Sequence, residues 1–169
     1  MLILLHSLYR YNPLPSGKWI RLLELCSTSA TDKVEFRLCQ HKLEETPKYE
    51  AISYAWGDPE DRINVLCNGK VISVTKNLMD ALRRLKLLDK TRLLWADAIC
   101  INQSDEVEKG MQVRLMKAIY DKAMKVCIWL GGATAEMQPA FQLIPQLVTY
   151  ATRENTCKLP FNRHNRYAC

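Results

Sequence analysis

The chain has 169 residues, about the length of one domain, and its 48% hydrophobic and 25% charged residues are typical of a globular protein. The longest apolar run near the N-terminus, residues 2–5, is too short for a signal peptide or a membrane span. These features argue against a secreted or membrane-spanning protein, and we expect a cytoplasmic protein with no membrane partner.

The net charge of +6 raises the question of nucleic-acid binding. Residues 153–169 carry four basic side chains and one acidic one, so half of the excess lies in a C-terminal tail. No DNA- or RNA-reading motif accompanies this tail. A solvated terminus explains the charge better than a binding surface, which leaves nucleic-acid binding through the tail as the weakest functional hypothesis.

The seven cysteines are an odd number and form no C-x-x-C pair. Several lie in apolar runs typical of strands. This pattern favours free buried thiols over a disulfide framework or a zinc site, and it predicts no metal centre.

Short strands are expected in the first half of the chain. Residues 19–25 and 34–39 read as two strands around a polar turn, and a third begins near Ala51 and ends at the turn residues 57–59. Residues 63–67 and 71–75 flank Asn68-Gly69, a strong hairpin signal. We expect this hairpin to project from the main sheet.

Two amphipathic helices are expected further along. The first has leucines at helical spacing and can be capped by Thr75 or Asn77; these leucines are Leu78, Leu82, Leu85 and Leu88. For the second, Asp105 and Glu108 resemble a capping box. Gly110 weakens its first turn, which places the well-formed start near Met111. Its expected apolar face is Val107, Met111, Leu115, Ala118 and Ile119.

An apolar strand over residues 92–97, this second helix and an apolar strand over residues 126–130 form a strand-helix-strand unit. Such a unit is nearly always a right-handed crossover between parallel strands. The run of residues 126–130 is apolar throughout, which predicts a strand inside the sheet and covered on both faces. The fold class expected is therefore α/β with a parallel central sheet, plus the hairpin and the N-terminal strands.

Three polar clusters follow strands of this sheet: Trp56-Gly57-Asp58, Asp97 through Gln103, and Gly131-Gly132. Ligand sites of open α/β sheets lie at the carboxyl ends of strands, so these clusters are expected at one edge. Asp97 is equally consistent with binding ribose hydroxyls or another polar ligand group and with capping its own loop. Apolar neighbours favour core positions for Trp56 and Trp129 over stacking platforms.

Cys100 is a weak candidate nucleophile. A catalytic cysteine needs a positioned base, and the histidines of the chain, His6, His41 and His164, all lie far from it in sequence. Motifs typical of NTPases, dehydrogenases, metalloproteases and hydrolases are absent from the sequence.

Two long motifs, YEAISYAWGD at residues 49–58 and LLWADAICINQSDEVEKGMQVRLMKAIYDKAMKVCIWLGG at residues 93–132, resemble the HET domain of fungal heterokaryon-incompatibility proteins. The resemblance implies an intracellular module of programmed cell death that associates with itself or with another signalling protein. It implies an extension over residues 1–18, a HET domain over residues 19–152, in a truncated or minimal form, and a tail over residues 153–169. Candidate ligand or motif residues are Ser53, Trp56, Gly57, Asp58, Cys100, Asn102, Gln103, Gln112 and Gly131.

The first motif is also similar to the first-strand motif of TIR domains, which implies a TIR-like, flavodoxin-like sheet. Residues 98–110 then correspond to the TIR loop that mediates assembly and borders a nucleotide site. Some TIR domains hydrolyse NAD with a glutamate, and this likeness implies Glu136 and Asp97 as candidate catalytic carboxylates and NAD as a candidate substrate. A carboxylate stabilises the oxocarbenium-like charge that develops when nicotinamide leaves. NAD hydrolysis is thus the enzymatic alternative to a purely interacting module.

Overall fold

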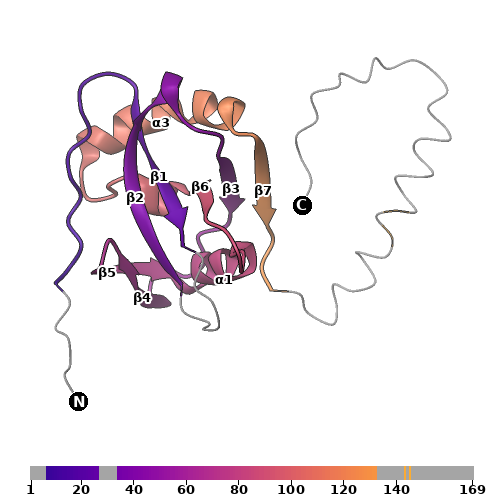
Figure 1. Cartoon of the computed structure of the whole chain (residues 1–169). Coiled ribbons are helices and arrows are strands. Elements are labelled where there is room, and N and C mark those ends of the chain that lie inside the picture. Colours follow the sequence, from indigo (N-terminus) through magenta and orange to yellow (C-terminus); the bar gives the residue numbers. More distant parts are fainter. Residues whose placement is uncertain (1–6, 27–33, 133–142, 144, 146–169) are drawn as a thin grey trace, which may run out of the picture. The chain divides into compact units, whose positions relative to one another are not determined.

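The computed structural model describes residues 7–26, 34–132, 143 and 145 (Figure 1). The described residues belong to two compact units, one with residues 7–26 and 34–130 and one with residues 131, 132, 143 and 145. Every strand and helix described below belongs to the first unit. Glu136 and the basic tail, residues 153–169, lie outside the described residues.

Seven strands form one sheet in the order β5-β4-β2-β1-β6-β3-β7. They are β1 Trp19–Leu25, β2 Glu35–Lys42, β3 Glu50–Tyr54, β4 Arg62–Cys67, β5 Lys70–Thr75, β6 Arg92–Trp95 and β7 Lys125–Trp129. The helices are η1 Leu43–Glu45, α1 Lys76–Leu85, α2 Asp97–Cys100 and α3 Glu106–Lys122. The α/β class is therefore confirmed, and each strand expected from the sequence is present.

The three strands expected to form the parallel centre of the sheet, β3, β6 and β7, are parallel, but the seven-stranded sheet as a whole is mixed. β3 runs parallel to both β6 and β7, so the crossover from β6 through α3 to β7 joins parallel strands as predicted. β1, however, pairs antiparallel with both β2 and β6. The connection between β1 and β2 is shorter than the dozen or so residues that a parallel crossover needs, so these two strands can pair only as antiparallel neighbours.

β7 is an edge strand of the described sheet, and its expected interior position is wrong. β3 lies between β6 and β7, and among the described residues β7 pairs with β3 alone. Val126 and Cys127 are buried, but Ile128 is 51% exposed. An apolar run in the sequence indicates a strand, but it does not show whether the strand has one neighbour or two. A strand that is buried only at one end already needs apolar residues at that end.

The hairpin forms at the predicted turn, with Asn68 and Gly69 both at positive φ (51° and 73°), as a tight two-residue hairpin requires. It does not project from the sheet, because β4 pairs parallel with β2 and Asn68 Oδ1 accepts a hydrogen bond from the Leu38 amide at 2.9 Å. The N-terminal segment follows the outer side of the hairpin, where the Tyr9 amide donates to the Val71 carbonyl at 2.7 Å.

Helix α1 follows the prediction except at its end. Leu78 and Leu82 are fully buried, whereas Leu88 lies beyond the last turn and is 79% exposed. Thr75 occupies the N-cap position without a side-chain cap hydrogen bond. Figure 1 places α1 beyond the carboxyl ends of β3 and β7.

Helix α3 begins at Glu106, five residues before the predicted start at Met111. The Asp105 carboxylate accepts hydrogen bonds from the Val107 and Glu108 amides, both at 3.0 Å. Such a cap contributes about 1 kcal/mol, which offsets the similar cost of Gly110.

The predicted apolar face of α3 is wrong in its first half. Val107 and Met111 are 70% and 59% exposed, whereas Glu108 and Gln112 are buried; further along, Ile119 is buried as expected. The helix is rotated because both buried polar side chains bind β1: Glu108 pairs with Arg21, and Gln112 Nε2 donates to the Trp19 carbonyl at 2.8 Å.

Tyrosine hydrogen bonds complete the contact between α3 and the sheet. Tyr49 donates to the Ile119 carbonyl at 2.5 Å, and Tyr120 donates to the Ile52 carbonyl at 3.3 Å. The Tyr120 ring also meets Trp95 edge to face, with centroids 5.4 Å apart. Among the described residues, no helix combines the length and apolarity that crossing a membrane requires.

Glu50, at the start of β3, is a buried carboxylate that joins the three parallel strands. It receives two hydrogen bonds from Arg92 of β6, one from the Cys127 thiol of β7 at 3.3 Å, and lies 3.4 Å from Lys125 Nζ. Burial by itself would raise the pKa of Glu50. The hydrogen bonds that it accepts from Arg92 and Cys127 and the positive charges of Arg92 and Lys125 lower this pKa by more than burial raises it. The pKa of Glu50 is therefore held below its ordinary value of 4.5.

This lowered pKa predicts an acid-sensitive sheet. Because the folded state binds the Glu50 proton more weakly than the unfolded state, its contribution to stability is complete above about pH 4.5 and is lost as the pH falls below that value. We expect Glu50→Gln to lower the free energy of unfolding at pH 7 by about 1.5–3 kcal/mol and to flatten its decline in acid, measured by urea unfolding. The exposed Glu60→Gln is the control; equal acid slopes in parent and Glu50→Gln would contradict the prediction.

Candidate functional site

Two of the three polar clusters meet at the carboxyl edge of the parallel strands, as predicted. Trp56 follows β3 and Asp97 follows β6, and the indole Nε1 donates a hydrogen bond to Asp97 Oδ2 at 3.1 Å. Gly131 and Gly132 belong to the second unit, so their place beside the other two clusters stays a prediction.

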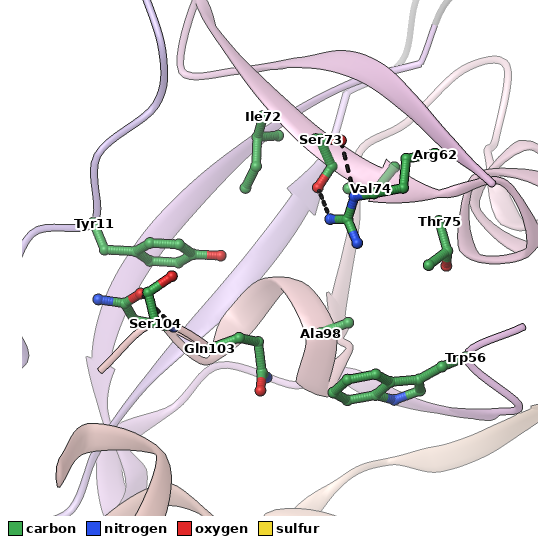
Figure 2. A pocket seen from close by; sticks show the side chains of 11 residues that line it. Tyr11, Trp56, Arg62, Ile72, Ser73, Val74, Thr75, Ala98, Gln103 and Ser104 are labelled. Atoms are coloured by element: carbon green, nitrogen blue, oxygen red, sulfur yellow. Dashed lines mark hydrogen bonds between the residues drawn. The ribbon is translucent and has the colours of Figure 1, made fainter. Parts of the chain in front are cut away.

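A pocket of about 240 Å³ lies beside this contact (Figure 2). One wall is formed by Arg62 and residues 72–75 of the β4–β5 hairpin, and the opposite wall is formed by Ala98 and residues 102–104. Tyr11 and Trp56 also line it. The site therefore combines the predicted loop after β6 with a hairpin and an N-terminal segment that the sequence did not connect to it.

Trp56 is not a core residue, which corrects the prediction. Its side chain is 46% exposed and lines the pocket. The cause is the following turn: Gly57 has φ of +76°, and a Cβ at this position would lie 3.2 Å from Asn77 Cβ. The turn and the hydrogen bond to Asp97 together hold the indole at the surface.

Asn77 joins the ends of two parallel strands. Its Nδ2 donates to the Ala55 carbonyl at 2.6 Å, and its Oδ1 accepts from Trp129 Nε1 at 2.8 Å. Trp129 is half-buried. Asn77 thus fixes the start of the turn that contains Trp56, and both polar atoms of its side chain are used in these bonds. The N-cap position of α1 is occupied by Thr75 instead.

Asp97 holds residues of the site in place but does not itself line the pocket. Its Oδ1 accepts from the Ala98 amide at 2.8 Å and its Oδ2 accepts from Trp56. It is half-buried and does not line the pocket. The buried Tyr54 phenol lies within its electrostatic reach: burial, followed by the negative charge of Asp97, raises the pKa of Tyr54. Asp97 therefore orients Trp56 and caps its own loop.

The loop after β6 is held by a buried ion pair. Arg21 and Glu108 form two hydrogen bonds of 2.5 and 2.9 Å, and their side chains are 2% and 9% exposed. Arg21 also donates to the carbonyls of Cys100 at 3.2 Å and Asn12 at 2.7 Å, while Glu108 accepts from the Asn102 amide at 2.8 Å. The pair therefore joins β1, α3, the loop and the N-terminal segment.

Cys100 is fully buried and its pKa is raised to about 12, chiefly by burial. A thiol in this state is not a nucleophile at neutral pH. Its sulfur instead accepts from the Ala96 amide at 3.4 Å. None of the five cysteines in the described ranges forms a disulfide bond, and no group of three or more metal-binding side chains gathers within those ranges.

Of the other candidate site residues, two line the pocket and three do not. Asn102 and Gln103 line the pocket, and Gln103 Nε2 donates to the Asp97 carbonyl at 2.9 Å. Asp58 closes an exposed turn by accepting from the Glu60 amide at 2.9 Å. Ser53 is half-buried in β3, and Gln112 is bound to β1, so neither lines the pocket.

Four pocket residues were not predicted from the sequence: Tyr11, Arg62, Ser73 and Thr75. The hairpin register offered a partial signal, since the turn at Asn68-Gly69 makes Arg62 and Thr75 cross-strand partners. For Tyr11 the sequence held no signal, because its place depends on a hydrogen bond from its hydroxyl to the Ile99 carbonyl, 88 residues away and 2.8 Å long.

The fold and the site define a mixed α/β domain with a pocket at the carboxyl edge of its parallel strands. The chain belongs to the heterokaryon incompatibility (HET) protein family, whose model matches residues 49–167 and confirms the resemblance described above. It is 38% identical over 128 residues to Heterokaryon incompatibility protein 6, OR allele, of Neurospora crassa, an alignment that covers 68% of this chain and 19% of that protein.

The chain thus spans about a fifth of the length of this curated relative. No solved structure matches the chain, so the TIR-like topology stays a prediction.

The buried pair predicts strong coupling between β1 and α3. Removing one partner leaves a buried charge, so Arg21→Met and Glu108→Leu should each lower the free energy of unfolding by about 3–5 kcal/mol. The double variant should lose much less than the sum of the two, measured in a double-mutant cycle by denaturant unfolding. Glu106→Leu, at an exposed position of α3, is the control; additive losses would show that the pair is not coupled.

Asp97→Asn tests how Trp56 is held. Asparagine can still accept from the Ala98 amide, but its amide group cannot accept from the Trp56 indole, so a loss of about 1–2 kcal/mol is expected. Thermal melting and tryptophan fluorescence measure stability and indole environment. The exposed Asp89→Asn should leave both unchanged. An unchanged melting temperature and spectrum in Asp97→Asn would contradict the supporting role.

Proposed function

We propose that this chain is a signalling module of fungal heterokaryon incompatibility that triggers programmed cell death. Family membership supports the proposal, together with the name of the Neurospora crassa relative, an incompatibility protein. We further propose that it acts by self-association or by binding another signalling protein, through the segment of residues 98–110 and the first turns of α3.

The observation that carries the mode of action is the exposure of apolar side chains beside a fixed loop. Val107 is 70% exposed and Met111, one turn further along α3, is 59% exposed. Methionine is enriched at protein interfaces and adapts to irregular partner surfaces. Exposed polar residues next to them, such as Ser104 and Glu106, suit an interface rim.

The rigidity of this segment supports the same proposal. The Asp105 cap, the Asn102 amide bound to Glu108, and the Arg21–Glu108 pair all fix the loop before any partner binds. A surface that is already ordered loses less conformational entropy on association, so less of the contact energy is spent on ordering it.

The enzymatic alternative, NAD hydrolysis, has weaker support. Of its two proposed carboxylates, Glu136 lies outside the described residues and Asp97 already accepts two hydrogen bonds. This alternative is nevertheless tested in the same experiment.

The double variant Val107→Asn with Met111→Gln should reduce self-association or partner capture at least tenfold, because it removes exposed apolar surface from the interface. The fold should be unaffected, since both side chains are exposed. Light scattering over a range of protein concentrations measures association, and expression in a fungal host measures cell death. The matched control is Val113→Asn, at a 54% exposed position on a different side of α3.

Equal association and equal cell death in the double variant and in the control would refute the interface. Release of nicotinamide from NAD by the assembled parent protein, with no dependence of cell death on association, would favour the enzymatic alternative.

A further inference from the structure

We propose that the pocket between the β4–β5 hairpin and the α2 segment is a ligand site for a small planar aromatic anion. This inference goes beyond the signalling role, because it assigns a ligand class to a site and does not depend on how the module assembles. Three features of the pocket carry it: an exposed indole, a fixed guanidinium and a buried hydroxyl with no partner.

Trp56 offers an aromatic surface to the pocket. Its ring is 46% exposed, and the hydrogen bond to Asp97 fixes its edge, which leaves the ring itself for contact with a ligand. Figure 2 shows the indole along the floor of the pocket, below the hairpin. Planar rings gain from contact with such a surface, and an oriented ring loses little entropy on binding.

Arg62 supplies a positive charge of fixed orientation. Its Nε and Nη2 donate to the hydroxyl and the carbonyl of Ser73, at 3.0 and 2.6 Å. Figure 2 shows the guanidinium extending from the hairpin toward Ala98. Of the described residues that line the pocket, Arg62 is the only charged one, so the pocket favours an anion over a cation.

Thr75 is the unpartnered polar group of the site. It is 7% exposed, and its hydroxyl has no hydrogen-bond partner in the described part of the chain. It lines the pocket, and Figure 2 shows its oxygen on the side that faces Trp56. A buried hydroxyl normally has a partner, because leaving it without one costs free energy. An oxygen of the ligand would supply that partner.

The size of the pocket restricts the ligand. Its volume of about 240 Å³ lies below the roughly 300–1,000 Å³ typical of sites that enclose drug-sized ligands. A single ring with one anionic group fits. A dinucleotide would have to extend out of the pocket.

The test is an NMR titration of the ¹⁵N-labelled full chain with benzoate and phenyl phosphate, which share the ring and the anion but differ in the anionic group. We expect either probe to shift the Trp56 indole resonance, and the better of the two identifies carboxylate or phosphate as the preferred group. Neutral benzamide should bind at least tenfold more weakly, because it cannot form the charge-assisted bond to Arg62.

Variants then assign the binding to the three features. Arg62→Gln should weaken binding about tenfold or more, while the exposed Arg84→Gln, with the same change of charge, should not. Thr75→Val removes the unpartnered hydroxyl with little change of shape, so it should weaken binding and leave the melting temperature unchanged or raised. Trp56→Leu should remove the preference for an aromatic ring over acetate.

The proposal is overturned if neither probe binds at about 10 mM, if benzamide binds as well as benzoate, or if Arg62→Gln and Arg84→Gln weaken binding equally. These outcomes concern the pocket alone. The association and cell-death measurements on Val107 and Met111 are independent of them, so failure of one proposal leaves the other standing.

Discussion

The Arg21–Glu108 pair is the interaction on which the described structure depends most. Burying two charges costs several kcal/mol unless their remaining hydrogen-bonding groups are satisfied. Here they are: the guanidinium also donates to the carbonyls of Cys100 and Asn12, and the carboxylate also accepts from the Asn102 amide. One pair therefore fixes the position of α3 on β1 and the course of the loop after β6.

The pocket follows from this arrangement. One of its walls, Ala98 and residues 102–104, lies beside the contacts that the pair makes with Cys100 and Asn102. Tyr11 holds the N-terminal side, because its hydroxyl donates to the Ile99 carbonyl of α2 and its ring centroid lies 4.9 Å from the Arg21 guanidinium carbon. The hairpin completes the pocket through a different connection, the pairing of β4 with β2. Three separate segments of the chain form the pocket. Their side chains can contact one ligand together only if the segments keep fixed positions relative to one another, and the Arg21–Glu108 pair provides the rigid contact that this requires.

Local signals in the sequence predicted local structure well. The turn at Asn68-Gly69 and the cap at Asp105 act on neighbouring residues, and both appear where they were expected. The errors arise where distant residues decide. Glu108 fits a capping box, yet its carboxylate binds Arg21, 87 residues away. That contact rotates α3 and exposes Val107. The exposure of Trp56 has the same kind of origin, because it depends on Asp97 across the sheet edge.

Amide hydrogen exchange at Asn102 tests the central role of the pair most directly, since this amide donates to Glu108. In Glu108→Leu, protection is expected to fall at least tenfold more at Asn102 and its loop neighbours than at amides of β3, while Glu106→Gln should leave both unchanged. A uniform loss of protection across the sheet and the loop would contradict this role, because it would show that the pair adds stability without organising the loop.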